Sequence, residues 1–219
     1  MGGLTVTDAV TLDTLLSWLG SFTDAVHEHQ GYLTELDSAI GDADHGANLT
    51  RGMDAVMAAV AGPNTERPDD AGALLTKVGM TLVTSVGGAS GPLYGTFFLR
   101  LGTTAGDAAE LDGPTLLQAL RAGLEGIVTR GRAEPGDKTM YDALAPAVAA
   151  LDAGLEQGES LSAAVRRAAT AAAEGRDATS DMLALKGRAS YLGERSVGHI
   201  DPGSASAALM LAALADAVR

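Results

Sequence analysis

Hydrophobic residues recur at intervals of three and four along most of the chain, which is the period of an amphipathic helix. Between residues 11 and 29, leucines at positions 12, 15, 16 and 19 are followed by Phe22 and Val26. The alternation of apolar and polar residues that marks a half-buried strand is absent from the helical segments. The pattern predicts helices over residues 11–29, 48–60, 70–86, 91–105, 114–130, 138–157, 160–182 and 203–218.

These segments predict an all-α fold of about eight helices, roughly the number that 219 residues hold at the average helix length. Alanine and leucine dominate the composition, and both favour helix over strand. The polar stretch 62–70 predicts a surface loop and is too short for a convincing linker between domains. We therefore expect one domain that spans residues 1–219.

The charge and the composition of the chain exclude several classes of function. The net charge of −13 and the pI of about 4.5 argue against nonspecific nucleic-acid binding and against an anionic membrane surface. The absence of cysteine excludes disulfides, thiolate nucleophiles and cysteine-ligated zinc. The first residues lack a basic stretch followed by an apolar run, so we expect no signal peptide and a cytoplasmic location.

Four polar, glycine-containing segments each lie directly before a predicted helix: residues 36–48, 85–95, 131–138 and 186–203. The start of a helix presents backbone N–H groups that lack intrahelical partners, together with the positive end of the helix dipole. If several such starts converge in the fold, they form an anion-binding site.

The first of these segments, LDSAIGDADHGAN, gathers Asp37, Asp42 and Asp44 around two glycines. Because Gly41 and Gly46 break helical geometry, we interpret the segment as a loop that chelates a hard cation through oxygen. Two carboxylates about 4 Å apart repel by roughly 4 kcal/mol at an effective dielectric near 20, and divalent cations offset that cost. A solvated turn is the structural alternative, since Asp and Gly are ordinary turn residues.

Other metal and catalytic motifs fit poorly. An EF-hand that begins at Asp42 would need a glutamate at position 53, where the chain has methionine. A zinc site would need several histidine ligands, and His45 is the histidine near the aspartates in the sequence. The glycine-rich SVGGASG lacks the lysine of a P-loop. Ser90 lacks the sequence of a nucleophile elbow, which argues against a serine hydrolase.

The segment 186–203 is the most basic region of this acidic chain, which makes it the natural place to meet a phosphate. We select Arg188 as the cation that faces a transition state, with a solvated loop as the alternative. His199 could act as a base, but a lone histidine is more often structural. The segment GRAEPGDKTM carries Arg132, Lys138 and Thr139 around Gly136, and a loop with a helix cap is as consistent with it as a functional role.

Together, the segments GDADHGAN, GMTLVTSVGGASGPLYGTFF, GRAEPGDKTM and KGRASYLGERSVGHIDPGS, in that order, resemble the nucleotide-binding subunit of dihydroxyacetone kinase, the DhaL family. The resemblance covers nearly the whole chain. It implies a barrel of eight antiparallel amphipathic helices with the nucleotide at one open end, in agreement with the helix count.

The resemblance also implies the roles of individual residues. Asp37, Asp42 and Asp44 would hold two Mg²⁺ ions that bind the diphosphate of ADP, and Arg188 would face the transferred phosphate. The nucleotide would further contact His45, Gly46, Ala47, Asn48, Ala89, Ser90, Gly131, Met140, Asp201, Pro202 and Gly203.

Two modes of action are known for the family. In one, ATP is the donor and exchanges freely. In the other, ADP stays bound as a coenzyme, is rephosphorylated to ATP by the phosphohistidine-carrying subunit M of the sugar phosphotransferase system, and passes the phosphoryl group to dihydroxyacetone on a separate subunit K. We expect the second mode.

Three other interpretations stay open: an ATP-dependent kinase subunit for another small ketose, a nucleotide-sensing protein that binds a transcription regulator, and a plain metal-binding helical protein. The oligomeric state is open as well, a homodimer included.

Overall fold

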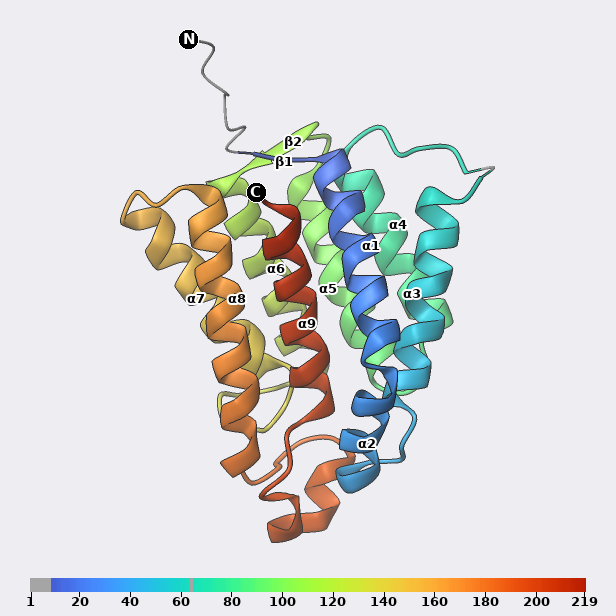
Figure 1. The fold of residues 1–219 in the computed structure, drawn as a ribbon, viewed down its shortest axis with the longest axis vertical. Helices are drawn as coiled ribbons and strands as arrows, with labels where there is room; N and C mark the ends of the chain where they lie inside the picture. The colour runs from blue at the N-terminus through green and yellow to red at the C-terminus, as the bar shows by residue number, and fades with distance from the viewer. Residues whose placement is uncertain (1–8, 64) are drawn as a thin grey trace.

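Helices make up nearly all regular structure in the computed structural model, which describes residues 9–63 and 65–219 (Figure 1). The α-helices are α1 (Leu12–Glu28), α2 (Gln30–Ile40), α3 (His45–Ala61), α4 (Ala71–Ser85), α5 (Ser90–Ala105), α6 (Gly113–Gly131), α7 (Tyr141–Glu156), α8 (Leu161–Ala178) and α9 (Pro202–Ala217). Two 3-10 helices, η1 (Thr179–Asp181) and η2 (Arg188–Ser196), lie between α8 and α9. The strands β1 (Ala9–Thr11) and β2 (Glu110–Asp112) form a small antiparallel pair. The all-α prediction is confirmed.

All of these α-helices except α2 form a closed ring of antiparallel neighbours (Figure 1). The ring begins with α1 against α3 and continues through α4, α5, α6, α7 and α8 to α9, which packs against α1 again. The helical barrel implied by the family resemblance is therefore what the structure shows. Among the described residues, no helix is both long and apolar enough to cross a membrane.

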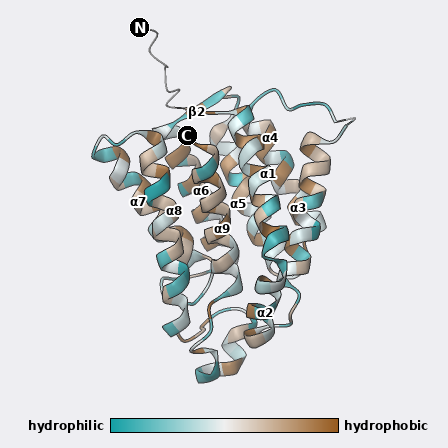
Figure 2. Ribbon diagram, viewed as in Figure 1, coloured by the Kyte–Doolittle hydropathy of each residue, from teal (hydrophilic) through white to brown (hydrophobic). Residues whose placement is uncertain are grey.

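Buried side chains fill the inside of the ring. Trp18, Phe97 and Phe98 are fully buried, and their rings pack with centroid distances of 5.6 Å for Trp18–Phe98 and 5.4 Å for Phe97–Phe98. The indole N–H of Trp18 donates to the carbonyl oxygen of Met210 at 2.9 Å, which joins α1 to α9 where the ring closes. Hydrophilic residues gather in the loops at the barrel ends (Figure 2). The apolar face of each helix is thus turned to one shared core.

The two ends of the barrel treat helix starts differently. Helices α1, α4, α6 and α8 begin at the end that carries the strands, and each has an N-cap side chain that accepts a backbone N–H of its first turn. Helices α3, α5, α7 and α9 begin at the opposite end (Figure 1). The N-cap residues of α3, α5 and α7 make no such side-chain bond, whereas α9 is capped by Asp201. Three helices therefore begin at that end without a hydrogen bond to the side chain of their own N-cap residue.

Helix α2 is absent from the sequence prediction, which treated its end as loop. Its buried residues are Leu33, Asp37 and Ile40, so a charged residue occupies one position of the apolar stripe. Helix α3 begins at His45, three residues earlier than predicted. Gly46 thus lies inside a helix, and our expectation that it breaks helical geometry is wrong.

Two other predicted boundaries are also wrong. The helix predicted over residues 138–157 begins at Tyr141, because Lys138 has a left-handed backbone with φ of 62° and cannot belong to an α-helix. The helix predicted over 160–182 ends as an α-helix at Ala178 and continues as η1. The last predicted loop contains η2. The start of the chain, where we expected no signal peptide, falls on residues 1–8, outside the described residues.

Glycines allow α4 and α5 to lie unusually close together. A Cβ atom on Gly79 would lie 2.7 Å from the backbone nitrogen of Leu99 and 2.8 Å from the carbonyl oxygen of Gly95. A Cβ on Gly95 would in turn lie 3.0 Å from the carbonyl oxygen of Gly79. Since these contacts involve backbone, repacking of side chains cannot relieve them. The close pair fixes the glycine-rich loop that connects α4 to α5.

We expect Gly79→Ala to lower the free energy of unfolding by about 3 kcal/mol, because the added methyl group forces the two helices apart. Equilibrium unfolding in urea measures the effect. Gly31→Ala is the matched control, since a Cβ at that helical position meets nothing within 4 Å. The control should gain up to about 1 kcal/mol from helix propensity. Equal effects of the two changes would contradict the close packing of α4 and α5.

Candidate functional site

A cavity of about 470 Å³ opens at the end of the barrel where α3, α5, α7 and α9 begin. Its wall takes residues from the start of each of these helices: 44–45, 88–90, 139–140 and 201–203. A fifth stretch, 186–189, closes one side. The four glycine-containing segments singled out in the sequence therefore meet at one place, which is the condition set for an anion-binding site.

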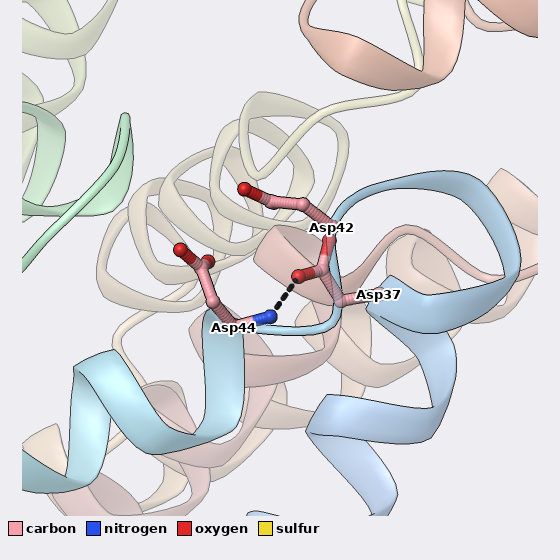
Figure 3. Close-up of side chains that lie close together, drawn as sticks. All are labelled: Asp37, Asp42 and Asp44. Carbon is pink, nitrogen blue, oxygen red and sulfur yellow. Dashed lines mark hydrogen bonds between the residues drawn. The ribbon is translucent and has the colours of Figure 1, made fainter.

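The three aspartates converge in this wall (Figure 3). One oxygen atom from each of Asp37, Asp42 and Asp44 lies within 4.8 Å of the others. Asp37 lies in α2, and Ala43, with φ of 62°, forms a left-handed turn between the other two. Three carboxylates at this spacing are the hard oxygen ligands that Mg²⁺ prefers. The residues present thus fit a magnesium site.

Asp37 has a second role, because it caps α3 from the neighbouring helix. Its Oδ2 atom accepts the backbone N–H of Asp44 at 2.8 Å and that of His45 at 3.1 Å (Figure 3). The N-cap residue of α3 makes no such bond with its own side chain. Asp37 therefore fixes the start of α3 relative to α2, whereas Asp42 makes no comparable backbone contact among the described residues.

Arg188 lies beside the aspartates. Its Nη2 atom is 2.9 Å from Oδ2 of Asp42, and the Arg188 side chain is otherwise largely exposed. The cation selected from the sequence is thus next to the cluster that would hold the metal. Arg130 and Lys186 also line the cavity, so cations lie close to the aspartates in a chain that is strongly acidic overall.

His45 is buried and is held from both sides. Its Nε2 lies 2.9 Å from the hydroxyl oxygen of Ser206, and that hydroxyl donates to the carbonyl oxygen of Gly203 at 3.0 Å. With that hydroxyl as donor, the Ser206 oxygen is free to accept a proton from Nε2, and this arrangement corresponds to the tautomer with the proton on Nε2. Nδ1 is the acceptor for the hydroxyl of Ser90, 3.0 Å away. Burial lowers the pKa of His45 against the opposing effect of nearby aspartates, which favours this neutral form.

Not every residue implied by the family resemblance lines the cavity. Gly46, Ala47 and Asn48 lie in the first turn of α3 but outside the wall. A Cβ on Gly46 would lie 2.3 Å from the carbonyl oxygen of Gln30, so this glycine permits α3 to approach α2. Asn48 is buried and its Oδ1 accepts from Nη2 of Arg51 at 2.7 Å. Gly46 and Asn48 thus support the start of α3 beside the site, whereas Ala47 is exposed.

The other implied residues all lie in the wall. Ala89 and Ser90 contribute from the N-cap and the first residue of α5, Gly131 from the end of α6, and Met140 from the N-cap of α7. The start of α9 contributes the last three, which are Asp201, Pro202 and Gly203. Asp201 caps α9 through a 2.6 Å bond from the backbone N–H of Ser204. Burial raises the pKa of Asp201 to about 7.

Sequence reasoning missed part of the wall. Tyr94 lines the cavity, and its hydroxyl lies 2.7 Å from that of Ser206. The available signal was its spacing of one helical turn from Ser90. Leu93 and Ile127 form an apolar part of the wall with Met140. These two look like ordinary core residues in the sequence, so no signal identified them.

A family model described as the DAK2 domain matches residues 39–216, which is most of the chain and includes every wall segment except Asp37. The chain belongs to the DAK2 domain family. Two relatives are described as ADP-binding subunits DhaL of dihydroxyacetone kinases. The PEP-dependent subunit of Escherichia coli (strain K12) is 44% identical over 94% of this chain and 96% of its own length. The PTS-dependent subunit of Lactococcus lactis is 41% identical over 95% of this chain and 99% of its own length.

A solved structure shares the fold of this DAK2 domain. It is the dihydroxyacetone kinase of C. freundii in complex with AMP-PNP and Mg²⁺, with a TM-score of 0.72 and 24% sequence identity. The superposition covers 99% of this chain and 36% of the C. freundii chain. At this identity the likeness establishes the helical barrel as a shared fold and nothing finer.

Proposed function

We propose that this DAK2 domain chain is the nucleotide-binding subunit of a dihydroxyacetone kinase, with ADP and Mg²⁺ held in the cavity at the barrel end. One observation carries the proposal: the three clustered aspartates face the same cavity as the starts of α3, α5, α7 and α9. A site with ligands for a hard cation beside helix starts suits a metal-bound diphosphate.

Each part of the cavity suits a part of the nucleotide. Asp37, Asp42 and Asp44 would hold two Mg²⁺ ions, and backbone N–H groups at Ala89 and Ser90 would meet phosphate oxygens. The apolar wall around Met140 suits the flat face of a base. When bound, Mg²⁺ supplies positive charge that neutralises the phosphates.

The chain's own residues contribute position and charge to phosphoryl transfer. The guanidinium of Arg188 lies at the cavity edge, where a transferred phosphoryl group would stand. Neutral His45 holds the Ser90 hydroxyl in place through its unprotonated Nδ1. The general base that deprotonates the hydroxyl group of dihydroxyacetone belongs, in this proposal, to the subunit that binds dihydroxyacetone.

The names of the relatives support a phosphohistidine donor, since the two subunits compared are PEP- or PTS-dependent. In this scheme bound ADP accepts the phosphoryl group from subunit M, and the resulting ATP passes it to dihydroxyacetone on subunit K. The segment of residues 183–197 beside the cavity is suited to contact such partners, because it exposes several large apolar side chains. They are Leu183, Leu185, Tyr191 and Val197.

The nucleotide content of the purified protein tests the proposal. The protein is gel-filtered extensively in Mg²⁺ and denatured, and the released nucleotide is identified by chromatography. We expect about one ADP per chain, as for a coenzyme that does not exchange. An empty protein that binds ATP reversibly would favour the alternative of an ATP-dependent kinase subunit. A protein that binds neither nucleotide would overturn the kinase assignment.

A further inference from the structure

Lys138 is a buried cation outside the set of residues that the proposed function uses. Its side chain is 1% exposed, although lysine is among the residues least often buried. Its Nζ atom donates to the carbonyl oxygens of Thr179 at 2.6 Å and Met182 at 3.2 Å, to that of His199, and more weakly to that of Ser180 at 3.5 Å. Because these partners are all backbone carbonyls, the ammonium fixes the course of the backbone around it.

The four carbonyls lie at the two ends of one segment. Residues 183–198, which we call the cap segment, leave the barrel after Met182 and return at His199. Lys138 therefore ties together the outgoing and returning ends of the cap segment. The Thr179 and Ser180 carbonyls also lie at the end of α8 and η1, where a cation interacts favourably with the helix dipole.

The loop that carries Lys138 is itself fixed. The carboxylate of Asp142 accepts the backbone N–H of Gly136 at 2.6 Å and that of Thr139 at 2.8 Å. The backbone N–H of Leu185, in the cap segment, donates to the carbonyl oxygen of Asp137 at 3.1 Å. The fixed loop and the long side chain of Lys138 thus determine the position of the two ends of the cap segment, which we call its base.

The tip of the cap segment reaches the site. Residues 186–189 line the cavity, and Arg188 lies 2.9 Å from the Asp42 carboxylate. Ala184 and Ala189 pack with Ile40 at the end of α2, in a small cluster separate from the main core. With this little apolar burial of its own, the cap segment depends on its base for its position.

We propose that Lys138 is a positioning residue that holds the cap segment over the cavity and thereby places Arg188. The consequence for phosphoryl transfer rests on the proposed function, whereas the effect on the cap segment does not. Removal of the ammonium takes the Lys138 donor from the carbonyls of Met182 and His199, whereas those of Thr179 and Ser180 keep the backbone N–H groups of Met182 and Gly198. The loss favours release of the base of the segment.

Hydrogen exchange of Lys138→Met tests the structural part. We expect amides of residues 183–198 to exchange at least about 10-fold faster, while amides of α1, α4 and α5 keep wild-type protection. Lys77→Met, on the outer part of α4, is the matched control and should leave both regions unchanged. Unchanged exchange in the cap segment, or an equal increase throughout the molecule, would overturn the proposal.

The kinetic part separates positioning from binding. In Lys138→Met we expect phosphoryl transfer to dihydroxyacetone on subunit K to fall about 100-fold, since small misplacements of a positioning group have effects of this size. Bound ADP per chain should fall far less than the transfer rate, by less than about 10-fold, because Lys138 lines the cavity with its ammonium bonded to backbone carbonyls and the aspartates are untouched. Parallel losses of ADP and transfer would overturn the positioning role. If the wild-type protein neither binds ADP nor transfers phosphoryl groups, the proposed function fails, and hydrogen exchange still decides the role of Lys138.

The absence of native cysteine permits a chemical rescue. Lys138→Cys is unfolded and alkylated with 2-bromoethylamine, whereupon the thiolate displaces bromide and a lysine-like aminoethyl side chain forms. After refolding, this protein should regain wild-type exchange in the cap segment. The same variant treated with iodoacetamide gains a neutral side chain and should resemble Lys138→Met. Equal behaviour of the two alkylated proteins would show that the ammonium is not what holds the segment.

Discussion

Asp42→Asn should leave the protein folded but nearly free of bound ADP. Asparagine keeps the shape of the side chain and removes the charge that a divalent cation requires. Loss of a residue that only orients a metal ligand costs about 10- to 100-fold in affinity, so loss of a ligand should cost at least that much. The measurement is ADP per chain after gel filtration in Mg²⁺, together with the free energy of unfolding in EDTA.

The structure separates this metal effect from a folding effect. Asp42 contacts Arg188 at the surface, and such ion pairs contribute about 0–1 kcal/mol, so stability should change little. Asp37→Ala should lose ADP and also about 1–2 kcal/mol of stability, because Asp37 caps α3. Asp107→Asn, an exposed charge at the other barrel end, controls for net charge and should keep ADP. A full complement of ADP in Asp42→Asn would refute the metal assignment.

The double role of Asp37 also explains why α2 was missed from the sequence. The apolar stripe of this helix passes through Leu33, Asp37 and Ile40, and a carboxylate at the middle position hides the helical period. In the ring helices α3 and α7, the buried His45 and Asp142 lie in the first turn, so the rest of each helix keeps the apolar period that predicts it. A carboxylate that caps α3 from the buried face of α2 thus obscured the helix that carries it.

The site was predictable where its chemistry is concentrated in short segments. The aspartate cluster and the four glycine-containing helix starts are visible in the sequence, and the structure brings them to one cavity. The anchoring of Lys138 was not predictable, because its partners are backbone carbonyls 41–61 residues away. Backbone carbonyls are present at every residue, so the sequence carries no sign of which ones a lysine will meet.

Arg188→Ala should reduce phosphoryl transfer by about 1,000-fold while the protein keeps its ADP. A guanidinium beside the transferred group stabilises charge that is greatest in the transition state, so its loss affects rate more than binding. Arg188→Lys should recover only part of the rate, since an ammonium lacks the planar donor pair of arginine. The measurement is the single-turnover rate from protein-bound ATP to dihydroxyacetone in the presence of saturating subunit K.

The control for this change lies in the same segment. Arg195 is exposed in η2 and is not part of the cavity wall, so Arg195→Ala removes an equal charge without removing the candidate group. Its transfer rate should stay within about twofold of wild type, because surface charges outside a site have small effects. If both variants slow transfer equally, the positive charge of the segment serves association with a partner, and Arg188 has no special role. If only Arg188→Ala is slow and its ADP content is intact, the guanidinium stabilises the phosphoryl group in the transition state of its transfer.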